Sequence, residues 1–214
     1  MIESNVMIAF ENILKKFNDR LVINDFNLNV RLGEKVLIYG KSGIGKSLLF
    51  KMLLGFQKPD SGNIYFNKCL IDQKTIWRIR KNIGYVGQEF DIGDGKVKDL
   101  FQTIFSYRNN TSIPFDTGQL NNHIEFFELP NGVLEENFEE LSGGEKQRLA
   151  IIIAIMLNRN VYLLDEATAS LDVSMKDKVA QYFMNNAQWT VLTISHDSAW
   201  KDCKGIRLID FEAL

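Results

Sequence analysis

The sequence contains little cysteine and proline and has no long uninterrupted apolar run. Its two cysteines, Cys69 and Cys203, are too few for a disulfide framework or a four-ligand zinc site, so we expect free thiols in a reducing compartment. The three prolines are scattered, and no Gly/Ser-rich linker or repeat divides the chain, which favours a single domain. The longest apolar run, residues 149–157, is far short of the roughly 20 residues that a membrane-spanning helix needs. The first residues also lack the basic and apolar regions of a signal peptide.

Neither sign of charge is in excess. Lys and Arg together number 25 against 27 Asp and Glu, which gives a net charge of −2. The chain as a whole has no surplus of basic residues to neutralise the phosphates of DNA or RNA, so we expect no nucleic-acid partner. The 214 residues are 45% hydrophobic and 24% charged, as in a globular protein. We therefore expect a chain that folds around its own core and that reaches a membrane only through a partner.

Strand-like and helix-like patterns alternate along the chain. The expected strands are 7–10, 21–30, 35–39, 83–86, 161–164, 190–194 and 206–209. The expected helices are 46–54, an amphipathic stretch from Val97 to Phe105, 143–157 and 173–185. Between Gln88 and Leu141 the pattern is only helical or irregular, which indicates an inserted helical lobe. This alternation predicts an α/β fold with a largely parallel sheet.

A glycine-rich loop follows the third expected strand. Residues 40–47, GKSGIGKS, fit the pattern G-x-x-x-x-G-K-[ST] between a strand and a helix, which is the context of a phosphate-binding P-loop. The glycines let backbone N–H groups close around phosphate oxygens at a helix N-terminus. Lys46 would reach the β- and γ-phosphates, and the Ser47 hydroxyl would ligate Mg²⁺. A glycine turn without function is the alternative, and the strand–loop–helix context argues against it.

Two acids end the apolar strand VYLLDE at residues 161–166. In a P-loop fold Asp165 would hold the Mg²⁺ shell, and Glu166 could polarise the attacking water as a general base. Apolar strands often end in acids, so this pattern gains its meaning from the P-loop that precedes it.

The segment LSGGE at residues 141–145, followed by Lys146, Gln147 and Arg148, decides the interpretation. Ser142 and the amides of Gly143 and Gly144 can bind a phosphate at the start of a helix. With these motifs in this order, the sequence resembles the ATP-binding cassette (ABC) ATPase family over about residues 6–210. The resemblance implies that this segment binds the γ-phosphate of ATP held by another protomer.

The resemblance also implies a fold. We expect the α/β core of a P-loop NTPase with a mainly parallel sheet, an N-terminal antiparallel β-subdomain and an inserted helical lobe at about 89–157, all within one ABC domain over residues 1–214.

Four further positions match the family. Gln88, after Tyr-Val-Gly, resembles the Q-loop glutamine that touches Mg²⁺ or water and links the core to the helical lobe. Asp172 ends a stretch, residues 169–172, that resembles the D-loop, which contacts the opposite protomer. His196, 30 residues after Glu166, resembles the switch histidine that donates to the γ-phosphate. Phe17 is a candidate for the aromatic side chain that stacks on adenine.

The resemblance thus assigns catalytic roles to Glu166, His196, Gln88 and Lys46, and Mg²⁺ ligation to Ser47, Gln88 and Asp165. The residues expected to bind ATP are Phe17, Gly40, Lys41, Ser42, Gly43, Ile44, Gly45, Lys46, Ser47, Leu48, Ser142, Gly143, Gly144 and Asp172. Two positions depart from the family: Leu48 replaces the usual threonine, and Ala167 stands where proline is frequent. Neither touches the reacting groups, so we expect at most an altered affinity for nucleotide.

The implied activity is Mg²⁺-dependent ATP hydrolysis by a head-to-tail dimer, formed with a second copy or with a homologous cassette. It would power solute transport by a separate membrane permease, with the chain peripheral on the cytoplasmic face of the cell membrane. The permease would dock on the helical lobe, although Phe90, Phe101 and Phe105 fit the core better than an interface. Residues 129–134, LPNGVL, are similar to bacterial cassettes of the iron-export type.

Two alternatives remain. A soluble ABC ATPase of DNA maintenance or translation usually carries coiled coils, zinc modules or a second cassette, none of which this sequence contains. A degenerate cassette would bind ATP only as a switch, and the intact Lys46, Asp165, Glu166 and His196 argue against it.

Overall fold

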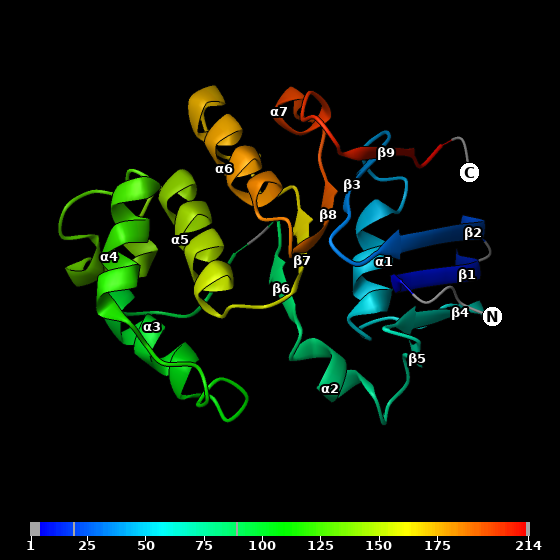
Figure 1. Ribbon diagram of the computed structural model, residues 1–214, viewed down its shortest axis with the longest axis horizontal. Helices are drawn as coiled ribbons and strands as arrows, with labels where there is room; N and C mark the ends of the chain where they lie inside the picture. The colour runs from blue at the N-terminus through cyan, green and yellow to red at the C-terminus, as the bar shows by residue number, and fades with distance from the viewer. Residues whose placement is uncertain (1–4, 19, 89, 213–214) are drawn as a thin grey trace.

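A computed structural model describes residues 5–18, 20–88 and 90–212 (Figure 1). Its strands are β1 (Val6–Phe17), β2 (Arg20–Arg31), β3 (Lys35–Tyr39), β4 (Ser61–Phe66), β5 (Cys69–Leu70), β6 (Ile83–Val86), β7 (Val161–Asp165), β8 (Thr190–Ile194) and β9 (Arg207–Asp210). Its α-helices are α1 (Lys46–Leu53), α2 (Ile76–Arg80), α3 (Val97–Ser106), α4 (Thr117–Phe126), α5 (Gly143–Met156), α6 (Val173–Asn185) and α7 (Ser198–Lys201). Two 3₁₀ turns, Val133–Glu135 and Phe138–Glu140, precede α5.

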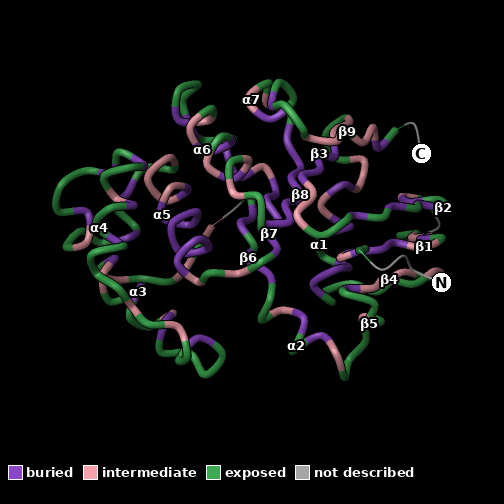
Figure 2. Tube along the Cα trace, in the orientation of Figure 1, coloured by how far each residue is buried: buried purple, intermediate pink, exposed green. Residues whose placement is uncertain are grey.

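A parallel sheet in the order β6-β7-β8-β3-β9 forms the centre of the molecule. Every residue of β7 and β8 is buried, as Figure 2 shows by colour, because both faces of the sheet are covered. Successive residues of β7 face opposite cores: Tyr162 and Leu164 pack with α5 and α6, and Val161 and Leu163 with α1 and the second sheet. The predicted α/β fold with a largely parallel sheet is confirmed.

A second sheet, antiparallel and in the order β2-β1-β4-β5, packs beside α1 (Figure 1). It confirms the expected antiparallel β-subdomain, but β1 extends to Phe17, well beyond the predicted residues 7–10. The sequence analysis did not predict β4, β5 or α2, each of which is six residues or shorter.

Helices α3, α4 and α5 lie together beyond the β6 edge of the parallel sheet (Figure 1). The side chains of Phe101 and Phe105 on α3 are 0% and 6% exposed, so they belong to the core, as expected. The lobe is therefore held to the sheet by a continuous apolar core, while its boundaries at about 89–157 stay a prediction. In the part of the chain that is described, no helix combines the length and apolar character needed to cross a bilayer.

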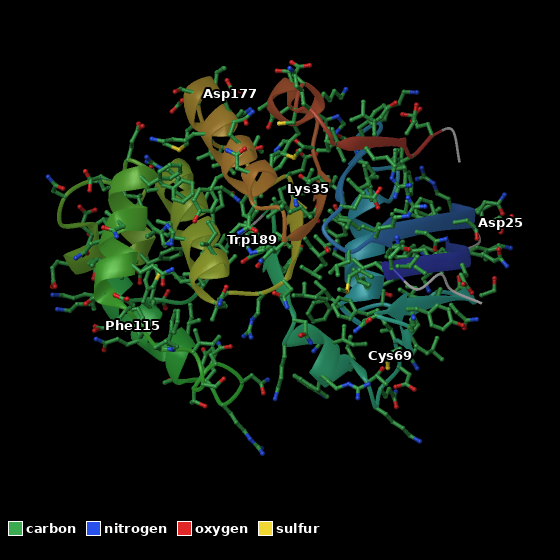
Figure 3. All side chains as sticks on the ribbon, in the orientation of Figure 1. Asp25, Lys35, Cys69, Phe115, Asp177 and Trp189 are labelled. Atoms are coloured by element: carbon green, nitrogen blue, oxygen red, sulfur yellow. The ribbon has the colours of Figure 1, made fainter. Side chains whose placement is uncertain are left out.

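A buried lysine ties the start of β3 to the loop before β8, near the middle of the molecule (Figure 3). The Lys35 ammonium donates to the carbonyl oxygens of Gly33, Asn186 and Trp189. Burial lowers the pKa of Lys35, and these three acceptors compensate for the water that its ammonium loses. This contact fixes the base of β3, whose other end begins the P-loop.

Candidate active site

The P-loop connects β3 to α1 and adopts a conformation that requires glycine. Gly43 and Gly45 have φ angles of 78° and 113°, and a Cβ on Gly45 would lie 2.6 Å from Cγ1 of Val22. The Lys46 ammonium donates to the carbonyl oxygens of Gly40 (2.6 Å) and Lys41 (2.7 Å). The loop is thus closed around its own lysine, at the N-terminus of α1.

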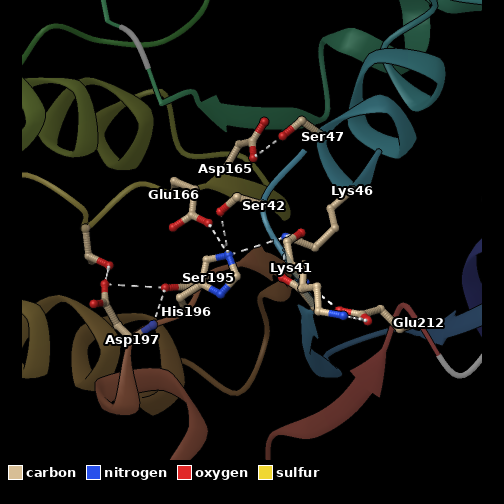
Figure 4. A network of polar contacts seen from close by, with 12 residues as sticks. Lys41, Ser42, Lys46, Ser47, Asp165, Glu166, Ser195, His196, Asp197 and Glu212 are labelled. Atoms are coloured by element: carbon tan, nitrogen blue, oxygen red, sulfur yellow. Dashed lines mark hydrogen bonds and ion pairs between the residues drawn. The ribbon is translucent and has the colours of Figure 1, made fainter. Parts of the chain in front are cut away.

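The two acids lie where the end of β7 approaches the P-loop (Figure 4). The Ser47 hydroxyl donates to Oδ1 of Asp165 at 2.8 Å, and Asp165 is 3% exposed. Burial raises the pKa of Asp165, although the bond from Ser47 opposes that shift. Glu166 is held with a φ of 51°, a conformation that costs a non-glycine residue free energy and is often found at functional sites. Burial also raises the pKa of Glu166.

His196 lies at the centre of this group (Figure 4). Its Nε2 is 3.5 Å from Oε1 of Glu166, 3.4 Å from the Ser42 hydroxyl and 3.4 Å from the Lys46 ammonium. Burial lowers the pKa of Lys46, while the charges of Glu166 and Asp165 act in the opposite direction. Residues from three distant parts of the sequence therefore form one polar cluster.

Asp197, the residue after His196, holds the loop that carries His196 in place. Its carboxylate accepts a hydrogen bond from Thr168 at 2.7 Å and pairs with Lys176 at 2.6 Å. The Trp200 indole donates to the Thr168 hydroxyl at 3.3 Å. These contacts hold the loops after β7 and β8 at a fixed separation, which is what positions Glu166 relative to His196.

A pocket of about 950 Å³ opens over the cluster. Its lining includes the P-loop from Ser42 to Leu48, together with Gln88, Glu166, His196 and Phe17. Its volume lies in the range of small-molecule sites. Gly40 and Lys41 do not appear in the lining, and their role in the structure is to accept the bonds from Lys46.

The oxygen atoms beside the pocket fit a bound Mg²⁺. Mg²⁺ favours carboxylate and hydroxyl oxygens and is usually held by few protein ligands together with substrate phosphates. Ser47 and Asp165 already place two such oxygens within hydrogen-bonding distance. Among the described residues there is no cluster of three or more His, Cys, Asp or Glu that could hold a metal ion without phosphate oxygens.

Residues 142–144 and Asp172, which the resemblance assigns to ATP binding, do not line this pocket. Ser142 caps α5 by accepting a hydrogen bond from the Glu145 amide, and Glu145 accepts one from the Ser142 amide at 2.8 Å. Asp172 caps α6 by accepting a bond from the Met175 amide at 3.0 Å. Neither Ser142 nor Asp172 appears in the lining of the pocket, so within one chain the structure does not bring them to the P-loop.

Comparison with known proteins agrees with this geometry. Residues 23–169 match the family model described as ABC transporter. The chain belongs to the ABC transporter family.

Two curated relatives and one solved structure are similar to most of the chain. It is 32% identical to the "Probable iron export ATP-binding protein FetA" of Escherichia coli (strain K12), over 92% of this chain and 88% of that protein. It is 31% identical to the energy-coupling factor transporter ATP-binding protein EcfA1 of Staphylococcus saprophyticus, over 89% of this chain and 73% of that protein. A dimeric ATP-binding cassette in a post-hydrolysis state with ADP and Pi superposes with a TM-score of 0.78, at 26% identity, over 96% of this chain and 95% of that one.

Several residues around the P-loop pocket were not predicted from the sequence. Tyr85 on β6 lies near Asp165, and burial together with that carboxylate raises the pKa of Tyr85 to about 12. Glu212, after β9, accepts a hydrogen bond from the Lys41 amide at 2.8 Å. Arg20 and Gln57 line the pocket. Of these residues, only Tyr85 could have been found from the sequence. It lies near the carboxyl end of an expected parallel strand, and the carboxyl ends of parallel strands meet at one edge of the sheet.

The departure at Leu48 allows one prediction about this cassette. Leu48, in the first turn of α1, is 8% exposed and packs in the core that α1 shares with the second sheet, yet it also lines the pocket. We expect Leu48→Thr to change the KM for ATP severalfold and to leave kcat within about twofold, because no reacting group touches it. Titration of ATP against both proteins checks this, and a large change in rate at saturation would contradict it.

Proposed function

We propose that the cassette hydrolyses ATP with Mg²⁺ and powers a separate membrane permease. The observation that carries the proposal is the cluster of Lys46, Asp165, Glu166 and His196 around the P-loop pocket. The relatives support the transport role, since their names describe ATP-binding proteins of transporters. The cassette itself would lie on the cytoplasmic face of the cell membrane, bound to the permease.

The proposed chemistry needs positioning more than covalent steps. The P-loop amides and Lys46 would bind the β- and γ-phosphates, and His196 would donate to the γ-phosphate. Glu166 would accept a proton from the attacking water. When bound through Ser47, Gln88 and Asp165, Mg²⁺ would supply positive charge that neutralises the phosphates.

Each site would be completed by a second chain. Ser142, Gly143 and Gly144 begin an α-helix whose N-terminus can bind phosphate, yet they lie away from their own P-loop pocket. A head-to-tail dimer would place this helix start over the ATP of the partner, with Asp172 and its loop at the contact between chains. The dimeric cassette that superposes on this chain supports such an arrangement.

An exposed aromatic surface formed by Phe56, which follows α1, and by Trp77 on α2 fits the contact with the permease, and it lies outside the helical lobe at about 89–157 that was expected to receive the permease. Phe56 and Trp77 are 61% and 63% exposed, and the Arg80 guanidinium lies 4.5 Å and 4.9 Å from the centroids of their rings. Residues 68–81 carry five basic side chains and one acid, Asp72, whose carboxylate accepts bonds from backbone amides. Charge complementarity therefore favours an acidic cytoplasmic segment of the permease with apolar side chains, since Trp and Arg dominate many interface energies.

Co-purification tests both parts of this proposal. The tagged chain is expressed in its native cell, membranes are solubilised gently, and the bound proteins are identified. We expect a stoichiometric multi-span membrane protein with the wild type and with Leu32→Ala, an exposed control (60%) in the turn after β2. We expect Trp77→Ala to lose that protein. Recovery of the wild type only from the soluble fraction would favour the soluble ATPase, and retention by Trp77→Ala would place the permease on another surface.

A further inference from the structure

A partly buried lysine, Lys15, lies against the ring of Phe17. Phe17 ends β1, is 44% exposed and lines the nucleotide pocket. Lys15 lies two residues earlier, on the same face of the strand, with its Nζ 5.3 Å from the centroid of the Phe17 ring. The Lys15 side chain is only 11% exposed, so its position is restricted by its surroundings.

Asp60 fixes Lys15 in this position. Its Oδ1 accepts a hydrogen bond from the Lys15 ammonium at 2.7 Å, and its Oδ2 accepts one from the Lys16 amide at 2.7 Å. The Asp60 amide in turn donates to the Leu14 carbonyl at 2.9 Å. Asp60 therefore contacts β1 at three points, and the charge of Lys15 is held against the ring without being free to move toward the pocket.

We infer that Lys15 is a positioning residue for the nucleotide base, acting through Phe17. An ammonium over an aromatic ring is attracted to its face and restricts the ring's orientation. With Lys15 on one face, the ring of Phe17 presents its other face to a planar base. This inference rests on the proposed binding of ATP, and it adds a source of affinity that the phosphate-binding motifs do not provide.

A structural role for Lys15 in joining β1 to the segment before β4 would have a different consequence. Loss of that support would disturb the neighbouring sheet and the P-loop, so every ligand would bind more weakly. Loss of base positioning would affect only ligands that carry a base. Inorganic tripolyphosphate has the phosphates of ATP without its base, and it separates the two cases.

The experiment measures displacement of a fluorescent ATP analogue by ATP and by tripolyphosphate, each with Mg²⁺. We expect Lys15→Met to weaken ATP about fivefold and to leave tripolyphosphate within about twofold of the wild type. Lys15→Arg, which can still pair with Asp60 and cover the ring, should restore ATP binding. Lys16→Met is the matched control, because Lys16 is exposed and, as the next residue of β1, points to the opposite face of the strand from Lys15 and Phe17.

A second variant keeps the test independent of folding. In a Phe17→Ala background, Lys15→Met should cause no further loss of ATP affinity, because Lys15 acts through the ring. An equal loss for ATP and tripolyphosphate, or an unchanged affinity for ATP, would overturn the inference. A wild type that binds neither ligand would instead overturn the proposed function on which it rests.

Discussion

Glu166→Gln is expected to stop ATP turnover while ATP still binds. The amide of glutamine cannot accept the proton that the carboxylate would take from the attacking water, so kcat should fall by about 100- to 10,000-fold. Glutamine has almost the same size, so the backbone of residue 166, with its φ of 51°, and the pocket around it should be preserved. The P-loop and Lys46, which would bind the phosphates, are unchanged.

Steady-state phosphate release and equilibrium binding of ATP together check this expectation. Glu135→Gln makes the same chemical change at an exposed site, where Glu135 pairs with Lys96 and Lys98, and it should keep wild-type turnover. Turnover of the Glu166→Gln protein within about threefold of the wild type would remove Glu166 from the mechanism.

Gly143→Asp is expected to reduce hydrolysis by about 100-fold, because it places a negative charge where the γ-phosphate held by the partner chain should bind. Gly143 is the first residue of α5, directly after the cap formed by Ser142. A Cβ at this position would lie 3.9 Å from the Ser170 side chain, which is ordinary van der Waals contact, so the first atom of the new side chain is accommodated. The expected loss is therefore electrostatic.

Gly143→Ala provides the control for size, and it should retain most of the activity. The Gly143→Asp protein should bind ATP like the wild type at low protein concentration, because its own P-loop is intact. Hydrolysis at the wild-type rate by Gly143→Asp would contradict a site shared between two chains. An equal loss in Gly143→Ala would indicate a steric effect instead.

The P-loop and the buried strand that ends beside it could be predicted because each is a short continuous segment with a recognisable sequence. The P-loop requires glycine at positions such as Gly45, where the backbone φ is 113°, so its sequence is constrained by local geometry. The buried strand β7 is continuously apolar and ends in Asp165 and Glu166, which places both acids at the edge where parallel strands end. These features depend on neighbours in sequence.

The remaining parts depend on contacts between distant residues, which no local pattern reveals. Strand β4 pairs with β1, and β5 pairs with β4. Both strands are too short for their apolar residues to show a clear period in the sequence. Asp60 meets Lys15 across 45 positions, and Glu212 meets Lys41 across 171. Within one chain Ser142 and Asp172 cap α5 and α6, and the contacts with ATP that we expect of them would require a second chain.

A single-turnover assay tests the central claim most directly. Labelled ATP is mixed with an excess of the wild-type chain, at a concentration that favours dimers, with either Mg²⁺ or EDTA present. The arrangement of Lys46, Asp165, Glu166 and His196 predicts conversion of ATP to ADP and phosphate with Mg²⁺ and none with EDTA. Bound ATP that stays intact in the presence of Mg²⁺ would contradict it, and would identify the chain as a cassette that binds nucleotide without hydrolysing it.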